Sequence, residues 1–421
     1  MIVFSENTSP RLNYIIDTLF PATTIRTNNR EEFLQYPGKK LNYSNEKISS
    51  NEIFVKPYSL LFEKNISPQQ VEVFKWNGIP AFFKTGGDIP FDLLAASFYL
   101  VSRYEEYFSW EPDEYGRFPH ISSIAFKNQF LEIPVIDQWI TKIFPPKSEP
   151  QFSLIPTFDI DIAYKYLQKP FAKNFILGIK EFIFVKWRSL SYRMNVRNGN
   201  QQDPFDVFDF IHTLAKKFSL QPIYFFLLAY KNGGYDKNIS PQNKGMRDLI
   251  SRVAQKNKTG IHPSWQSGEN ENILSEEIKI LQQLSLQKVT TSRQHYIRMK
   301  LPNTYRALIA NGIAEDYSMG YGSINGFRAS TSKPFFWYDL EKEEKTNLKI
   351  YPFCYMDANS IFEEKLNPKE TEAELEFYKK ITTGTYGQMI GIWHNHFLTN
   401  EKEWLPWRNV FEKFIENSML N

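Results

Sequence analysis

The feature that most constrains this chain is an alternation of apolar strand patterns with amphipathic helix patterns beyond residue 150. Strands are predicted at 152–158, 222–229, 287–291, 348–355 and 389–394. Helices are predicted between them, at 204–218, 244–256, 274–286, 301–311 and 369–381. Strands that alternate with helices of this length form βαβ units and a parallel sheet. Roughly 270 residues of such alternation favour an α/β fold of the (β/α) barrel kind over an open three-layer sheet.

A proline-rich polar segment, FPPKSEP at 144–150, divides the chain and indicates a linker. It predicts a smaller N-terminal α+β domain at 1–146 and a barrel domain at 151–421. The N-terminal part mixes short strands with one clear helix pattern at 90–108. Arg103, Glu105 and Glu106 are expected on a solvated polar face of that helix.

Composition excludes several classes of function. Fifty basic and 47 acidic residues give a formal net charge of +3, which offers no electrostatic argument for a nucleic-acid partner. The single cysteine, Cys354, excludes an intrachain disulfide and a multi-cysteine metal site. We expect a cytoplasmic protein without a membrane span, because no signal-peptide pattern is found and the longest apolar stretch, at 171–187, is interrupted by charged residues.

Polar side chains follow the ends of the predicted strands with unusual regularity. These are Asp159, Asp161, His262, Arg293, His295, Asp316, Asp357, His394 and His396. In a barrel, the carboxyl ends of the strands meet at one face, where active sites are built. We therefore expect a single convergent site, the alternative being a set of independent solvated loop ends.

The residue types in this set are those of a metal centre with acid–base groups beside it. Four of the six histidines belong to it, and imidazole and carboxylate are ligands of zinc and similar divalent ions. Asp159 and Asp161 are two residues apart at a strand end, so both carboxylates point to one side. A cation between them would relieve their repulsion. The alternative is that one carboxylate caps the next helix and the other is solvated.

Residues 151–400 resemble the polysaccharide deacetylase family, the NodB-homology domain, which is a distorted (β/α) barrel. The segment TFDID at 157–161 is similar to that family's T-F-D-D-G motif, HPSW at 262–265 to its H-S/T-x-x-H motif, and His394 in MIGIWHNHF to its L-x-H motif. The resemblance implies that Asp159 is the catalytic base and His394 the general acid. It also implies that Asp161 and His262 bind a divalent metal, with zinc favoured.

The chain departs from the family motifs at defined positions. Ile160 replaces the second aspartate of T-F-D-D-G, Gln266 replaces the second histidine of the next motif, and R-x-P-x-G is absent. We predict His295 as the third metal ligand and Arg293 as the residue that orients Asp159, with Arg328 as the alternative arginine. The predicted substrate contacts are Trp265, Asp316, Tyr321, Arg328 and His396.

The first 146 residues resemble an uncharacterised domain that precedes deacetylase-like domains in bacterial proteins. DIPFDLL at 88–94, SRYEE at 102–106 and GRFP at 116–119 carry this similarity, which implies no function.

The sequence as a whole predicts a metal-dependent hydrolase that removes an N-acetyl group from an amino sugar in a glycan or glycan precursor. Two alternatives remain open. One is a metal-free C–N hydrolase on the same fold, and the other is a glycan-binding protein without catalysis.

Overall fold

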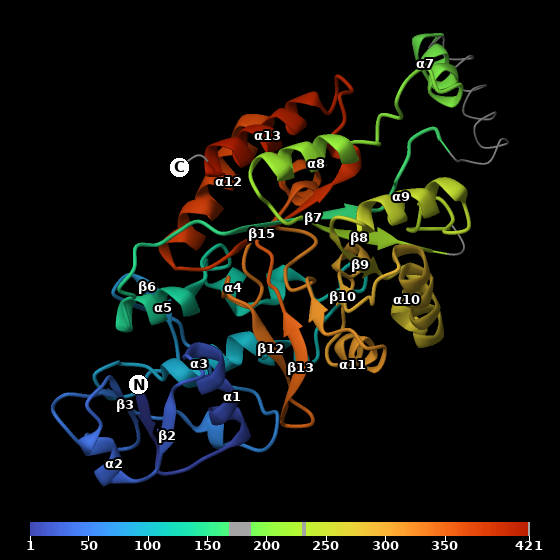
Figure 1. Cartoon of the computed structure of the whole chain (residues 1–421). Helices are drawn as coiled ribbons and strands as arrows, with labels where there is room; N and C mark the ends of the chain where they lie inside the picture. The colour runs from blue at the N-terminus through green and yellow to red at the C-terminus, as the bar shows by residue number, and fades with distance from the viewer. Residues whose placement is uncertain (168–186, 230–232, 420–421) are drawn as a thin grey trace.

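A computed structural model describes residues 1–167, 187–229 and 233–419 (Figure 1). Residues 171–186 of the apolar stretch considered above lie outside these ranges. Within them, every helix is too short or too polar to cross a bilayer.

A nine-stranded sheet organises the chain beyond residue 150, in the order β12-β13-β11-β10-β9-β8-β7-β15-β14. The strands are β7 (Leu154–Ile160), β8 (Ile223–Leu227), β9 (Lys258–His262), β10 (Thr291–Ser292), β11 (Glu315–Asp316), β12 (Phe335–Asp339), β13 (Glu344–Ile350), β14 (Tyr355–Met356) and β15 (Met389–His394). Among the described neighbouring strands of this sheet, only β12 and β13 pair in antiparallel orientation. The prediction of an α/β fold around a mostly parallel sheet is confirmed.

The sheet curls into a half-barrel (Figure 1). Its end strands, β12 and β14, do not pair with each other in the described part of the chain. The N-terminal region covers the β12 end instead, where the Tyr14 hydroxyl donates to the carbonyl of Phe336 at 2.7 Å and Arg11 pairs with Glu343. Covering the strand edge in this way protects it from pairing with another chain.

Helices cover the sheet, as the alternating pattern predicts. They are α8 (Phe208–Lys217), α9 (Lys244–Ala254), α10 (Glu271–Ser285), α11 (Asn303–Ala310), α12 (Pro368–Gly384) and α13 (Leu405–Met419). A further helix, α7 (Trp187–Arg197), projects away from the sheet (Figure 1). All residues of β8 and β15 are buried, which is typical of parallel strands covered on both faces. The strand predicted at 389–394 is β15, whereas β9, β11 and β12 were missed.

The N-terminal region forms its own small parallel sheet, in the order β2-β1-β3-β4. The strands are β1 (Ile2–Phe4), β2 (Ile25–Thr27), β3 (Lys40–Tyr43) and β4 (Ile53–Val55), and a hairpin follows, β5 (Phe74–Trp76) with β6 (Ile79–Ala81). The helices are α1 (Pro10–Leu19), α2 (Arg30–Gln35), α3 (Leu93–Val101), α4 (Ile124–Lys127) and α5 (Val135–Ile143). The region therefore contains more helix than the one clear helix pattern at 90–108 indicates.

The helix predicted at 90–108 is shorter than its apolar pattern suggests. The side chain of Asp92 caps the start of α3 by accepting from the backbone N–H groups of Leu94 and Ala95. The helix ends at Val101, and at Arg103 the backbone enters the left-handed region with a φ of 55°. This turn carries the following residues inward instead of along a solvated helix face.

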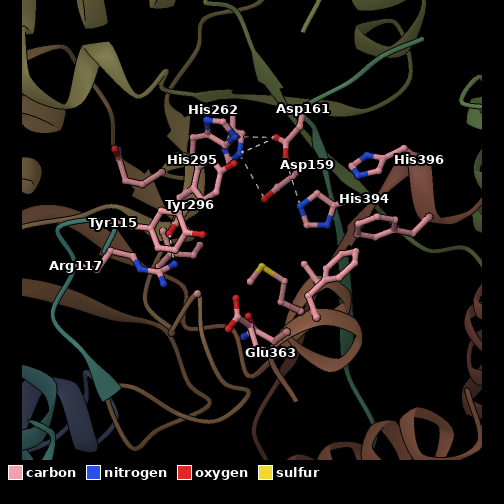
Figure 2. A pocket seen from close by; sticks show the side chains of 18 residues that line it. Tyr115, Arg117, Asp159, Asp161, His262, His295, Tyr296, Glu363, His394 and His396 are labelled. Atoms are coloured by element: carbon pink, nitrogen blue, oxygen red, sulfur yellow. Dashed lines mark hydrogen bonds and ion pairs between the residues drawn. The ribbon is translucent and has the colours of Figure 1, made fainter. Parts of the chain in front are cut away.

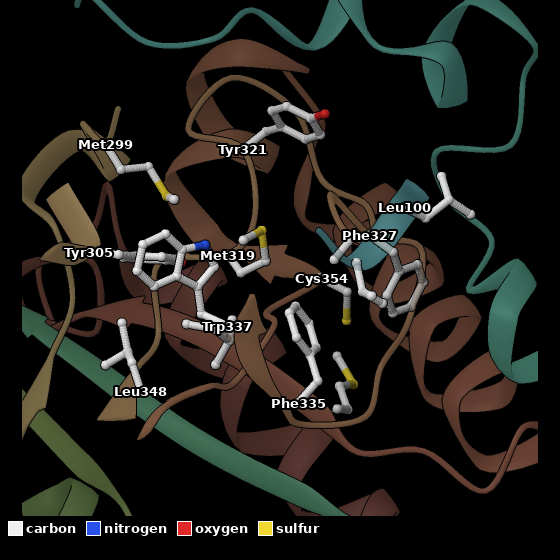
Figure 3. Packing of buried hydrophobic residues seen from close by; sticks show 14 of the residues in the cluster. Leu100, Met299, Tyr305, Met319, Tyr321, Phe327, Phe335, Trp337, Leu348 and Cys354 are labelled. Carbon is white, nitrogen blue, oxygen red and sulfur yellow. The ribbon is translucent and has the colours of Figure 1, made fainter. Parts of the chain in front are cut away.

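The prediction that Arg103 and Glu106 lie on a solvated face is therefore wrong, because both side chains are buried between the N-terminal region and the rest of the chain. Glu106 accepts from Nε and Nη2 of Arg328 at 2.8 and 2.6 Å, and from Nε of Arg103 at 2.7 Å. All three side chains are at most 2% exposed. Apolar packing accompanies this network, with Leu100 of α3 in the same core as Phe327 (Figure 3).

Replacing Glu106 with alanine should destabilise the protein by about 3–5 kcal/mol, because two buried guanidinium groups would lose their shared carboxylate. Denaturant unfolding measures this change. Asp248→Ala is the matched control, since the Lys244–Asp248 pair is solvent-exposed and should contribute less than about 1 kcal/mol. A Glu106→Ala variant as stable as the control would contradict the importance of this network.

Candidate active site

A cavity of about 320 Å³ opens at the carboxyl ends of the central parallel strands (Figure 2). Its lining includes Asp159, Asp161, His262, His295, His394 and His396, together with Tyr115 and Arg117 of the N-terminal region. The strands β7, β9 and β15 run parallel in the same part of the sheet, where β15 is next to β7 and β8 lies between β7 and β9. Their last residues and the turns after them therefore meet here. The half-barrel thus brings together side chains from residues far apart in the sequence.

Asp161, His262 and His295 form a group that could hold a metal ion. Their ligand atoms all lie within 4.8 Å of one another. Oδ1 of Asp161 is 3.2 Å from Nε2 of His262 and 3.8 Å from Nε2 of His295. This buried oxygen has no well-aligned hydrogen bond among the described residues, which suits an atom that serves as a ligand.

Both histidines are oriented through their other ring nitrogen. Nδ1 of His262 lies 2.6 Å from the carbonyl oxygen of Arg293, and Nδ1 of His295 lies 3.1 Å from Oδ1 of Asp236. These acceptors favour the tautomer with the proton on Nδ1, so that each Nε2 offers its lone pair toward Asp161. The donor set and its orientation fit a divalent metal.

Electrostatics in the cluster match this arrangement. Burial opposes ionisation of Asp161, but His295, His262 and His394 hold its pKa well below its ordinary value. Burial likewise opposes protonation of His262, yet Asp159 and Asp161 raise its pKa. In the absence of a metal, the imidazoles and carboxylates stabilise one another.

Asp159 differs from Asp161 in that its carboxylate is bound by Arg293. Oδ1 of Asp159 accepts from Nη1 of Arg293 at 2.9 Å, and Oδ2 lies 3.8 Å from Nε2 of His262. The guanidinium is fully buried and also donates to Oγ1 of Thr157 and to the carbonyl of Tyr317. Asp159 is therefore held as an oriented carboxylate beside the metal-binding group.

His394 lies on the other side of Asp161 and is held by Asp357. Nδ1 of His394 is 2.6 Å from Oδ1 of Asp357, and its backbone N–H donates to Oδ2 at 2.7 Å. Its Nε2 faces Oδ2 of Asp161 at 3.5 Å. Burial lowers the pKa of His394, but Asp357 and the nearby carboxylates raise it to about 9. A protonated imidazole beside the cavity can donate a proton.

Asp236 and Asp357, the two carboxylates that orient His295 and His394, were assigned no role from the sequence. Asp357 follows a predicted strand, and its position at a strand end was the available signal. Asp236 lies in a loop beyond residues 230–232, and nothing local in the sequence marks it. Both act through a histidine, and such pairings are visible only once the chain is folded.

The predicted substrate contacts are distributed unevenly. His396 lines the cavity, its Nδ1 has no hydrogen-bond partner among the described residues, and burial lowers its pKa to about 3. Trp265 lies outside the lining, stacked on Tyr235 with ring centroids 4.0 Å apart.

The other three predicted contacts also lie away from this cavity. Asp316 is bonded to Ser292 and Ser318, the hydroxyl of Tyr321 lies 3.3 Å from Nη2 of Arg103, and Arg328 is bound to Glu106. Each of these side chains is at most 2% exposed, because each links neighbouring segments of the fold. A substrate role for any of the five residues stays a prediction.

Among known families, a sequence match covers only the N-terminal part of the chain. A family model described as a family of unknown function, DUF7033, matches residues 1–145. A sequence search of curated proteins finds no match.

Two solved structures are similar to parts of the fold. A Mycobacterium smegmatis protein assigned to the polysaccharide deacetylases is 13% identical, with a TM-score of 0.39 over 65% of this chain and 85% of its own. A polysaccharide deacetylase from Bacillus cereus is 11% identical, with a TM-score of 0.32 over 63% of this chain and 88% of its own.

The purified protein should bind about one divalent ion per chain, because Asp161, His262 and His295 present three converging ligands. Elemental analysis after dialysis against zinc measures the content. The double variant Asp161→Ala, His262→Ala should lose the ion, whereas the exposed control Asp248→Ala should keep it. Equal metal content in all three proteins would contradict this assignment.

Asp357→Asn should lower the pKa of His394 from about 9, because the carboxylate that stabilises the imidazolium is removed while burial still favours the neutral ring. In the wild type, His394 should keep its proton until the pH approaches that value. In the variant it should release the proton at a lower pH. NMR titration of the imidazole signals in metal-free protein measures both; an unchanged midpoint would rule out Asp357 as the cause.

Proposed function

We propose that this protein is a metal-dependent hydrolase that removes an N-acetyl group from an amino sugar in a glycan or glycan precursor. The observation that carries the proposal is the composition of one cavity. It combines three residues that could hold a metal with a carboxylate bound by Arg293 and a histidine bound by Asp357. Amide hydrolysis needs a base to activate water and an acid to protonate the departing nitrogen, on opposite sides of the reacting carbonyl.

The motif resemblance supports the same assignment. The residues that it relates to the deacetylase motifs, Asp159, Asp161, His262 and His394, all line this cavity. Gln266 departs from the family pattern, and His295 from the neighbouring strand end supplies a third ligand-type atom in its place. The departure in sequence therefore leaves a group of three ligands in the cavity.

The residues of the chain can be given distinct roles. Asp159, oriented by Arg293, takes a proton from the water that attacks the acetamide carbonyl. His394, with Asp357 on its Nδ1, donates the Nε2 proton to the amine nitrogen as the C–N bond breaks. Asp161, His262 and His295 hold the metal. Acetate and the free amino sugar are the products.

A divalent ion at this place would polarise the acetamide carbonyl and make water more acidic. One carboxylate and two imidazoles are a ligand set typical of catalytic zinc, so zinc is the metal that we propose.

Asp159→Asn should reduce acetate release by at least about a hundredfold, because the amide cannot accept the proton of the attacking water. The substrates are oligomers of N-acetylated hexosamines, and released acetate is measured. The amide oxygen can still accept from Arg293, so the fold and the metal content should be preserved. Asp248→Asn is the control. Undiminished turnover by Asp159→Asn would refute the assignment of the base.

The same assay separates the alternatives. Full activity after exhaustive chelation would favour a metal-free C–N hydrolase, for which the Ile160 and Gln266 departures provide the motive. Saturable sugar binding without acetate release, unchanged in Asp159→Asn, would favour a glycan-binding protein.

A further inference from the structure

A short loop of the N-terminal region enters the cavity from the side opposite His394 (Figure 2). Tyr115 and Arg117 of this loop line the cavity. The carboxylate of Asp113 fixes the loop, since Oδ1 accepts from the backbone N–H groups of Tyr115 and Arg117 at 3.0 and 2.9 Å. The region matched by the family of unknown function therefore contributes directly to the wall of the candidate active site.

Arg117 bridges this loop to the segment that carries His295. Its Nε donates to Oδ2 of Asp113 at 2.6 Å, and its Nη1 donates to the carbonyl oxygen of Tyr296 at 2.9 Å. Arg117 is only 5% exposed. A planar guanidinium can bind both acceptors at once in a fixed geometry, which a lysine ammonium cannot reproduce.

The backbone held by Arg117 is strained. Tyr296 and Ile297 have φ values of 57° and 55°, a left-handed conformation that is unfavourable for non-glycine residues and most of all for a β-branched side chain. Such residues persist only where the surrounding structure holds them. Here they follow His295 directly, so holding their backbone also helps to hold the backbone from which its imidazole projects.

Aromatic packing also links the N-terminal loop to His295. The Tyr115 ring stacks on Tyr296, with centroids 5.1 Å apart and an interplanar angle of 18°. The Tyr296 ring in turn contacts His295, with centroids 4.5 Å apart. On the far side, Nδ1 of His295 is held by Asp236. The imidazole is thus fixed between a carboxylate and an aromatic stack that begins in the N-terminal region.

We propose that the N-terminal region completes the metal site: Arg117 is a positioning residue that holds the strained backbone after His295, and Tyr115 supports the imidazole through Tyr296. The role of His295 as a metal ligand rests on the proposed function. The contact of Arg117 with the Tyr296 carbonyl does not, and it is tested separately below.

Hydrogen exchange tests the positioning without any metal. In Arg117→Ala, the amides of Ile297 and Arg298 should lose protection, because the strained turn, in which these N–H groups donate to the carbonyls of Gln294 and His295, loses its support. Arg30→Ala is the matched control in the same region, since Arg30 forms an exposed pair with Glu46. Unchanged protection in Arg117→Ala would overturn the proposal.

A second variant disrupts the same contact from the other side. A Cβ at Gly322 would overlap Nη1 of Arg117 and lie 2.9 Å from the carbonyl oxygen of Tyr296. Gly322→Ala should therefore reproduce the loss of protection seen in Arg117→Ala. Gly384→Ala is its control, because nothing lies within 4 Å of a Cβ at that position. Full protection in Gly322→Ala would contradict the proposal.

Zinc affinity tests the consequence for the site. Competition titration with zinc alone should give a dissociation constant about tenfold or more weaker in Arg117→Ala, as expected when a residue that orients a ligand is removed. Arg117→Lys should recover part of the loss. Glu106→Ala, which removes a contact between the same two regions but does not line the cavity or touch Arg117, should bind zinc normally at temperatures where it is folded.

The outcomes distinguish this proposal from the proposed function. Equal loss of affinity in Glu106→Ala and Arg117→Ala would show a general structural effect and overturn the positioning role. If the wild type binds no zinc, the metal-dependent function fails, and hydrogen exchange alone decides whether Arg117 positions the segment. Weaker zinc binding in Arg117→Ala without acetate release by the wild type would support the positioning role and reject the deacetylase.

Discussion

One buried guanidinium, that of Arg293, connects the strands that build the candidate site. Its Nη1 donates to Thr157 and Asp159 at the end of β7, and its Nε donates to the carbonyl of Tyr317 after β11. The backbone carbonyl oxygen of Arg293 accepts from His262 at the end of β9. A charge without solvent contact must be paired in this way or pay a large desolvation penalty. The strand ends are therefore held in one arrangement, with the carboxylate of Asp159 fixed toward the cavity.

The acid–base groups follow the same pattern of pairing. Each of the three histidines nearest Asp161 has Nδ1 directed to a different acceptor: the carbonyl of Arg293, the carboxylate of Asp236 or the carboxylate of Asp357. This leaves each Nε2 directed toward one aspartate. Because the cluster is buried, these charges interact strongly: carboxylates raise the pKa of His394, whereas burial and the neighbouring His394 lower that of His396. The pKa values of two histidines two residues apart are thus shifted in opposite directions.

The N-terminal region contributes more to this site than its own sheet suggests. It buries Glu106 against Arg328, covers the β12 edge, and inserts Tyr115 and Arg117 into the cavity wall. The sequence patterns predicted Glu106 as solvated and assigned no residue of the N-terminal region to the cavity. Local periodicity describes only the face of one helix, whereas a buried ion pair across more than two hundred residues depends on how two regions dock.

The sequence by itself determined the alternation of strands and helices and the positions of Asp159, Asp161, His262 and His394, because a strand end is a local property and parallel strands place such ends at one edge. The sequence also indicated His295 as a further ligand of the same site. Only the tertiary structure decided that Asp236 and Asp357 orient two of the histidines, and that Arg328 binds Glu106. Those contacts depend on the curl of the half-barrel and the docking of the N-terminal region. Both arise from burying apolar surface between segments far apart in the chain, and no local sequence pattern records them.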